Sequence, residues 1–186
     1  CDACGAGKSQ SMKGQALCAA CPRGRFQANT GEDRCAACDE GEFMNETGAT
    51  ACLKCSTEKG RGYWSSAGAT ECDQADVRYF MNTQTGEPEE CLKGTKCTKA
   101  GITTETIRVE TGYYRFSIFS SAVYPCMANC RGSSDKSSDS AGRRRRLGLV
   151  TDTRCAKGSH GPLCSLCDSD RYLDASTGRC RPCNMG

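Results

Sequence analysis

The chain has 186 residues, of which 18 are cysteines, whereas leucine, isoleucine, valine and phenylalanine together supply only 20. So little apolar area argues against a conventional hydrophobic core, and this cysteine content is typical of small domains held together by disulfides. The net charge is +3, and four consecutive arginines account for it, so a broad nucleic-acid-binding face is not expected. No run of 18 apolar residues is present, so no membrane insertion is predicted within this segment.

The cysteine content also predicts a cellular compartment. Disulfides persist in oxidising surroundings, so we expect an extracellular or cell-surface protein that passes through the secretory pathway. The sequence contains no secretory signal, and it begins and ends inside cysteine motifs, at Cys1 and Cys183. We therefore expect it to be a segment of a longer exported protein.

A tandem repeat of 17 residues occupies residues 1–72. The line CAACPRGRFQANTGEDR, from Cys18, is followed in register by CAACDEGEFMNETGATA and then by CLKC. Each repeat carries a cysteine doublet, a Gly-x-Phe and a Thr-Gly, and such self-similarity is typical of an array of small units. The Gly-x-Phe and the later turn residues predict a short strand, a tight turn and a return to the next doublet.

One turn in this array contains a glycosylation acceptor. Asn45-Glu46-Thr47 has the sequence that the glycosylation machinery recognises in exported proteins. Asn45 is therefore either glycosylated or an ordinary turn asparagine.

Residues 73–97 form a degenerate repeat and a junction. Ala75 occupies the position at which the second cysteine of a doublet is expected, whereas the aromatic pair and the Thr-Gly are kept. This hairpin should therefore lack a disulfide of its own.

Residues 98–131 are predicted to form a pair of β-strands. Residues 102–110 alternate in the manner of a strand, and an aromatic-rich stretch at 113–124 follows the break at Gly112. The aromatic side chains would either bury a small core or present a patch to a partner; they are Tyr113, Tyr114, Phe116, Phe119 and Tyr124.

Residues 132–147 are predicted to form a flexible, polar and basic loop that ends in Arg143, Arg144, Arg145 and Arg146. The arginines could be a processing site for a protease of the export pathway, a contact for a polyanion, or a solvated charge run. Residues 148–186 then resume the cysteine repeats, and the segment from Cys155 to Cys164 has the spacing of the last loop of an epidermal-growth-factor-like (EGF-like) module.

Two sets of motifs resemble known families. The pattern C-P-x-G-x-F with a later Thr-Gly, at residues 21–35, resembles the ephrin-receptor-like cysteine-rich repeat and the first half of a tumour-necrosis-factor-receptor module. The middle of the chain, with GITTETIRV, GYYR and GPLC, is similar to a block that follows such repeats in large surface proteins of single-celled eukaryotes. Ala75 and the basic loop depart from the pattern. The resemblance implies a small disulfide-rich fold of mostly β and loop structure, an elongated tandem array of disulfide-stapled β-hairpins with an EGF-like segment near the C-terminus.

The resemblance also implies how most cysteines pair, because the second cysteine of each doublet joins the first cysteine of the next. The pairs implied are Cys4–Cys18, Cys21–Cys35, Cys38–Cys52, Cys55–Cys72, Cys155–Cys164 and Cys167–Cys180, while Cys1 and Cys183 face outward. Three pairings remain open for the last four cysteines. We favour Cys97–Cys126, because these residues bracket the predicted strand pair, which leaves Cys91–Cys130.

Zinc binding is the chemical alternative to disulfides, since two doublets separated by 13 residues have a spacing known from zinc modules. We favour disulfides, because the C-terminal half contains cysteines outside doublets and no feature marks which doublets would share a metal. Neither a metal nor another cofactor is therefore expected. His160 is the only histidine, and it lies in a Gly-Ser-His-Gly turn without a catalytic motif, so no catalytic residue and no enzymatic activity are predicted.

These features lead to two functional hypotheses. The favoured one is a non-enzymatic structural or adhesive stalk within a larger cell-surface, matrix or filament protein. Its partners would be other domains of the same chain, other extracellular proteins or further copies of itself. The alternative is a receptor ectodomain that binds a protein ligand, with a zinc-binding module as a third reading.

Overall fold

The computed structural model describes residues 3–12, 17–126, 128–133 and 153–183. These residues form ten two-stranded antiparallel sheets with almost no helix, in which each odd-numbered strand pairs with the strand that follows it. The fold is thus a tandem set of small hairpins, as expected. The strands are β1 (Lys8–Ser9), β2 (Ala19–Ala20), β3 (Arg25–Phe26), β4 (Ala36–Ala37), β5 (Glu42–Phe43), β6 (Leu53–Lys54), β7 (Tyr63–Trp64), β8 (Gln74–Ala75), β9 (Tyr79–Met81), β10 (Pro88–Glu90), β11 (Thr95–Lys96), β12 (Arg108–Val109), β13 (Tyr113–Tyr114), β14 (Tyr124–Pro125), β15 (Cys130–Ser133), β16 (Thr153–Cys155), β17 (Ser159–His160), β18 (Leu166–Cys167), β19 (Arg171–Asp174) and β20 (Arg179–Pro182). The helical turns are α1 (Cys55–Glu58) and the 3-10 turn η1 (Pro162–Cys164).

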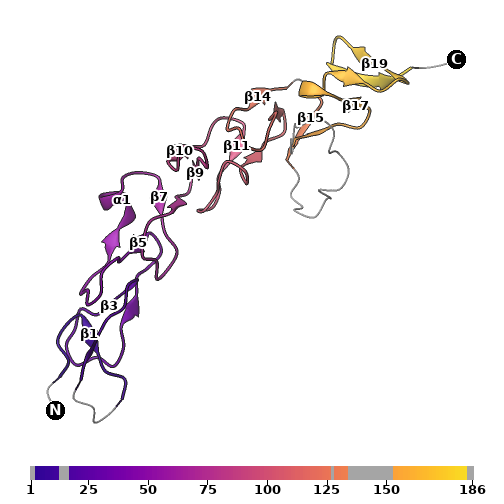
Figure 1. Cartoon of the computed structure of the whole chain (residues 1–186). Coiled ribbons are helices and arrows are strands. Elements are labelled where there is room, and N and C mark those ends of the chain that lie inside the picture. The colour runs from indigo at the N-terminus through magenta and orange to yellow at the C-terminus, as the bar shows by residue number, and fades with distance from the viewer. Residues whose placement is uncertain (1–2, 13–16, 127, 134–152, 184–186) are drawn as a thin grey trace. The chain divides into compact units, whose positions relative to one another are not determined.

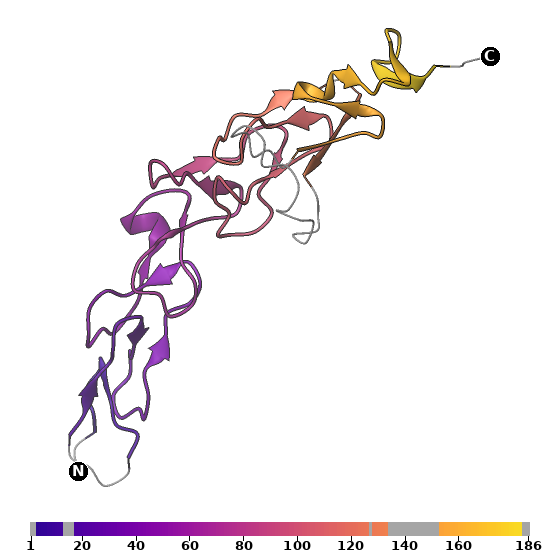
Figure 2. The same cartoon turned by 45° about the vertical axis from the view of Figure 1, so that its right-hand side comes forward.

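The chain divides into two compact units. The N-terminal unit comprises Cys1–Met81 with Lys99–Ile102, and the C-terminal unit comprises Asn82–Thr98 with Thr103–Gly186. Within the N-terminal unit the hairpins that begin at β1, β3, β5 and β7 follow one another in sequence order (Figures 1 and 2).

Each hairpin of the N-terminal unit is built from a glycine and a cysteine doublet. Gly24 has φ 76°, a left-handed conformation that glycine adopts at little cost, and it directs the chain into β3. The return strand β4 consists of the two alanines inside the next doublet, in the register Arg25↔Ala37 and Phe26↔Ala36. The amide of Cys38 then donates to the Gly24 carbonyl at 2.9 Å and closes the hairpin.

Backbone hydrogen bonds also join each repeat to the repeats that follow. The amide of Gly24 donates to the carbonyl of Met44 at 2.8 Å, and the amide of Gly48 donates back to the carbonyl of Cys21 at 2.7 Å. Gly24 also lies so close to Gly68, two repeats along, that a Cβ atom at Gly24 would overlap the Gly68 carbonyl oxygen. Successive hairpins are therefore docked main chain against main chain.

The apolar core of the N-terminal unit is correspondingly small. Phe43 forms a buried cluster with Cys55 and Cys72, and the partly buried Tyr63 and Ala69 pack against it. A cluster of this size buries too little apolar area to act as a conventional core. The backbone hydrogen bonds and the disulfides therefore contribute much of the stability of the unit.

The strand pair expected in residues 98–131 does not form. Residues 103–106 make a turn instead of continuing a strand, since the Thr106 amide donates to the Thr103 carbonyl at 3.0 Å and the Thr106 hydroxyl accepts from the Thr103 amide at 2.9 Å. Only β12 remains of the first predicted strand, and it pairs with β11. The second predicted strand is reduced to β13, which pairs with β14. The central region therefore consists of two separate hairpins.

The aromatic residues of this region split between core and surface. The Tyr114 and Phe116 rings lie 5.1 Å apart between centroids, edge to face, and Tyr114 belongs to a buried cluster that is otherwise made of cysteines. Phe116 also meets Tyr124 edge to face at 5.3 Å, although Tyr124 is 46% exposed and Phe119 is 53% exposed.

Candidate functional site

Disulfides are the principal chemical feature of the described residues. Eight are present, and six of them join the residues that the family resemblance implies. In the N-terminal unit the Cα atoms of each bonded pair lie 5.6–5.7 Å apart. These six pairs are Cys4–Cys18, Cys21–Cys35, Cys38–Cys52, Cys55–Cys72, Cys155–Cys164 and Cys167–Cys180.

The expected pairs Cys97–Cys126 and Cys91–Cys130 are wrong. The structure joins Cys91 to Cys97 and Cys126 to Cys130. The expectation rested on a strand pair that Cys97 and Cys126 would bracket, and that pair does not form. A tight turn, with the Thr95 amide donating to the Leu92 carbonyl at 3.0 Å, brings Cys91 and Cys97 together instead.

Four cysteines form the densest group of sulfurs in the C-terminal unit, and we call Cys126, Cys130, Cys155 and Cys164 the four-cysteine cluster. Cys126 ends the hairpin of β14, Cys130 begins β15, Cys155 ends β16, and Cys164 ends η1. The Sγ atoms of Cys126, Cys130 and Cys164 all lie within 4.8 Å of one another, and these three residues are buried. The disulfides Cys126–Cys130 and Cys155–Cys164 therefore lie side by side in one hydrophobic cluster with Tyr114.

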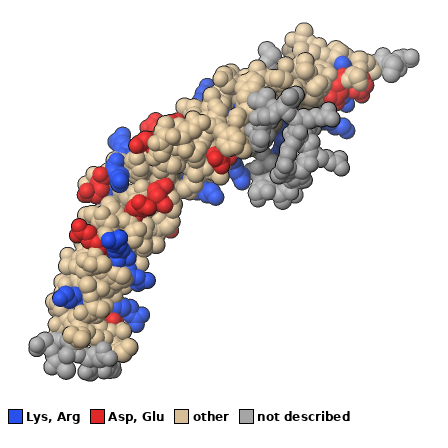
Figure 3. Space-filling model, in the orientation of Figure 1, with Lys and Arg blue, Asp and Glu red and all other residues tan. Residues whose placement is uncertain are grey.

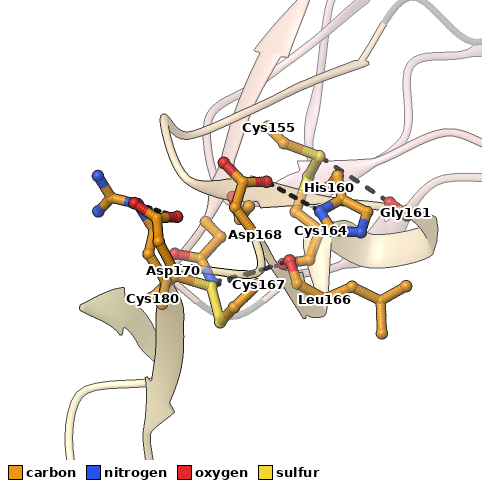
Figure 4. A network of polar contacts seen from close by, with 12 residues as sticks. Cys155, His160, Gly161, Cys164, Leu166, Cys167, Asp168, Asp170 and Cys180 are labelled. Carbon is orange, nitrogen blue, oxygen red and sulfur yellow. Dashed lines mark hydrogen bonds and ion pairs between the residues drawn. A yellow bond between two sulfur atoms is a disulfide. The ribbon is translucent and has the colours of Figure 1, made fainter. Parts of the chain in front are cut away.

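His160 lies next to this cluster in a polar network (Figure 4). Its Nδ1 atom is 3.1 Å from Oδ1 of Asp168, and both side chains are about half exposed. The disulfides Cys155–Cys164 and Cys167–Cys180 flank the pair, so the neighbouring sulfurs are not thiolates (Figure 4). The arrangement fixes the turn between β17 and β18, where Ser159 is paired with Cys167 and His160 with Leu166.

Asp174 is the carboxylate with the largest shift in acidity among the described residues. Hydrogen bonds from Ser176 and Thr177, together with the charge of Arg181, lower the pKa of Asp174 to about 2. The Arg181 Nε atom lies 2.7 Å from Asp174 Oδ2, and the Ser176 amide donates to Oδ1 at 2.9 Å. This group caps the turn between β19 and β20 and has the geometry of a structural anchor.

The remaining predicted sites are placed as follows. Asn45 is exposed in the turn after β5, where a glycan would have room. Arg143, Arg144, Arg145 and Arg146 lie outside the described residues. Among the described residues, Cys183 is the only free cysteine, and it is exposed.

The sequence did not point to a buried arginine. Arg115 follows β13 and is fully buried, and its Nη1 atom donates to the Thr104 carbonyl at 2.7 Å. Its amide donates to the hydroxyl of Thr153 at 3.0 Å, so it connects the turn before β12 with β16. An arginine within an aromatic run reads as a surface residue, and no local pattern signals that it is buried.

Charged side chains of both signs are interspersed over the visible face of the described residues (Figure 3).

No protein-family model and no curated protein sequence matches this chain. The eight disulfides of the described residues indicate an oxidising environment, as in the secretory pathway. None of the described helices has the length and apolar character needed to cross a membrane.

Proposed function

We propose that this chain is a non-enzymatic structural or adhesive stalk within a larger extracellular or cell-surface protein. The observation that carries the proposal is the backbone docking of successive repeats in the N-terminal unit, where the amides of Gly7, Gly24 and Gly41 each donate to a carbonyl of the next repeat at 2.7–2.9 Å. In a tandem array of this kind each unit is held mainly by its neighbours, and stiffness comes from repetition.

The disulfides limit how far the array can be stretched, because the shortest route through covalent bonds passes across each disulfide and bypasses the loop that it closes. Only two residues lie between Cys18 and Cys21, between Cys35 and Cys38 and between Cys52 and Cys55. Each disulfide adds its Cα–Cα distance of 5.6–5.7 Å. At the full extension of a peptide chain, residues 4–72 therefore reach about 55 Å when oxidised, against about 240 Å when reduced. A pulling force meets covalent bonds long before the chain has unravelled, which suits a load-bearing stalk.

Single-molecule pulling on the whole chain tests the proposal. With the disulfides intact, the chain should resist forces of several piconewtons without lengthening in the N-terminal unit, because the docked repeats must separate together. Reductant should then release lengthening steps of about 45 Å for each loop of 14 residues, such as that between Cys21 and Cys35. Lengthening of the oxidised chain at forces that merely straighten an unstructured linker would reject the stalk.

A receptor ectodomain is the second candidate, and one observation favours it. The C-terminal unit exposes several large apolar side chains, which would suit a protein partner; they are Phe119, Tyr124, Leu166, Tyr172 and Leu173. Saturable binding of an extracellular protein that is lost on Tyr172→Ser, combined with low resistance to force, would favour this candidate. Self-association of the chain in sedimentation velocity would instead favour an assembling stalk.

We also propose that Asn45 carries a glycan in the native protein. The side chain is exposed and its acceptor sequence occupies a turn, so a glycan would project into solvent. An endoglycosidase should lower the mass of the secreted chain, and Asn45→Gln should abolish that change. An unchanged mass in the secreted wild-type chain would reject glycosylation at this site.

A further inference from the structure

The four-cysteine cluster places two disulfides within reach of each other. The Sγ atoms of Cys126, Cys130 and Cys164 lie within 4.8 Å of one another, although Cys126 is bonded to Cys130 and Cys164 to Cys155. Cys126 Sγ also lies 2.9 Å from the carbonyl oxygen of Leu163, the residue before Cys164. Cys126 therefore has Cys164 as a neighbour as well as its own partner, Cys130.

The register of β15 and β16 supplies a second neighbouring pair. Cys130 is directly opposite Cys155 in this antiparallel pair. The adjacent residues carry the ladder bond, since the amide of Ala156 donates to the carbonyl of Asn129 at 2.6 Å. Cys130 and Cys155 thus occupy a non-hydrogen-bonded position, where opposing Cα atoms lie about 4.5 Å apart and side chains are closest. This separation falls within the range of Cα–Cα distances that a disulfide spans.

We propose that the cluster has a second pairing, Cys126–Cys164 with Cys130–Cys155, reached by thiol–disulfide exchange without unfolding of the C-terminal unit. This inference is independent of the proposed stalk function. In the structure, the two disulfides close local loops with sequence separations of 4 and 9. In the second pairing both bonds connect the chain before residue 131 to the chain after residue 154. Exchange would therefore convert two local loops into two long-range links, of which Cys130–Cys155 joins β15 to β16 and Cys126–Cys164 joins the end of the β14 hairpin to η1.

The exchange needs only a small external thiolate and involves no net oxidation. Cys155 is the one member of the cluster that is partly exposed, whereas the other three are buried. The thiolate attacks Sγ of Cys155, and the Cys155–Cys164 bond breaks with Cys164 leaving as a thiolate. Cys164 attacks Sγ of Cys126 and displaces Cys130. Cys130 attacks Sγ of Cys155 across the strands and expels the external thiolate, so that two disulfides are present before and after.

The local backbone marks this site as unusual. Leu163 and Cys164 both have φ 52°, in the left-handed region that residues other than glycine rarely adopt. Such conformations cluster at switch regions, where the surrounding structure holds them. The bond between Cys155 and Cys164 is one of the restraints that exchange would remove.

Peptide mapping distinguishes the two pairings. The whole chain is incubated with reduced and oxidised glutathione, trapped with acid and a maleimide, denatured, and cut with trypsin. In the pairing of the structure, peptide 116–131 holds Cys126 and Cys130 and is free of other peptides, whereas peptide 155–157 is linked to peptide 158–171. In the second pairing, peptide 116–131 is linked to both.

We expect the linked form to increase with glutathione while Cys21–Cys35 and Cys167–Cys180 stay intact. The proposal is overturned if peptide 116–131 stays free, and also if it becomes linked only as the other disulfides scramble. The doubly substituted chain Cys126→Ser with Cys164→Ser gives a second readout, because Cys130 and Cys155 should then form a disulfide with each other. Thiols remaining at both positions would overturn the proposal. Cys126→Ser with Cys130→Ser is the matched control, and it should keep Cys155–Cys164.

Discussion

Adding one methyl group at Gly24 tests whether the repeats are held by close backbone contact. Gly24 and Gly31 belong to the same repeat and have φ values of 76° and 81°. A Cβ atom at Gly24 would overlap the Gly68 carbonyl oxygen, whereas at Gly31 its nearest neighbour would be the Ala3 Cβ at 3.5 Å, an ordinary van der Waals distance. Gly31→Ala is therefore a control that carries the same conformational penalty without the overlap.

The two substitutions should differ severalfold in their effect on the free energy of unfolding. Alanine in the left-handed region costs about 1–2 kcal/mol, and part of this is offset by the lower entropy of the unfolded chain, so Gly31→Ala should cost about 1 kcal/mol. Gly24→Ala must also push apart two backbone segments, at about 1–3 kcal/mol for overpacking. It would weaken the bond between Gly24 and Met44 as well, so its total should be about 3–4 kcal/mol.

Trp64 provides the assay, because it is the only tryptophan and its ring packs against Gly41 within the N-terminal unit. Denaturant titration followed by Trp64 fluorescence, with the disulfides intact, reports the unfolding of that unit. The midpoint should fall far more for Gly24→Ala than for Gly31→Ala, with unchanged slopes. Equal shifts for the two variants would show that conformational freedom, and not close docking of repeats, explains these glycines.

Three further predictions follow from the disulfides and the C-terminal unit. Maleimide added to the denatured, unreduced chain should label at most Cys1 and Cys183, and labelling of most cysteines with release of zinc would contradict the disulfide structure. Arg115→Met should lower the free energy of unfolding by about 2–3 kcal/mol, because it leaves the Thr104 carbonyl without this donor. The control Arg131→Met replaces an exposed arginine and should change the free energy of unfolding by less than about 0.5 kcal/mol. Thermal unfolding and hydrogen exchange of β13 measure the effect of each variant. The Asp174 pKa of about 2 lies below the usual value of 3.8 for an aspartate. The ionised Asp174 carboxylate therefore stabilises the folded chain above about pH 4, and this contribution is lost as the pH falls toward 2. NMR titration of the Asp174 carboxyl carbon should show this midpoint, and hydrogen exchange in β19 should lose that pH dependence in Asp174→Asn.

The hairpins that are repeated in the sequence could be predicted, whereas the strand pair expected in residues 98–131, which occurs once, could not. The cysteine doublet at Cys35 and Cys38 predicts a hairpin together with the doublets on either side of it, because the Gly-x-Phe and the Thr-Gly that form the hairpin lie within one 17-residue repeat. Residues 102–110 alternate as a strand does, but threonine also forms turns through its hydroxyl, and the bond between Thr103 and Thr106 decides in favour of a turn. The expected pairs Cys97–Cys126 and Cys91–Cys130 rested on the predicted strand pair, so the error in the strand became an error in the disulfides.

The buried Arg115 illustrates a different limit. Its burial depends on Thr104 and Thr153, which are 11 and 38 residues away, and nothing in the sequence around either threonine points to a contact with Arg115. Contacts between segments so distant in sequence leave no periodic pattern. Only the three-dimensional structure identifies them.

Ala75 shows that the docking of one repeat on the next does not require a cysteine at this position. It stands where a cysteine is expected, yet it is fully buried, and its carbonyl accepts from the Gly101 amide at 2.8 Å. The carbonyls of Cys21 and Cys38 accept from Gly48 and Gly68 in the same way, at 2.7 and 2.8 Å. The hydrogen bond that docks one repeat on another therefore survives the loss of the sulfur. A disulfide stabilises mainly by restricting the unfolded chain, whereas the glycines and carbonyls fix how the folded repeats meet. An array built in this way can lose a single cross-link and keep its geometry, but it cannot accept a side chain at a docking glycine such as Gly24.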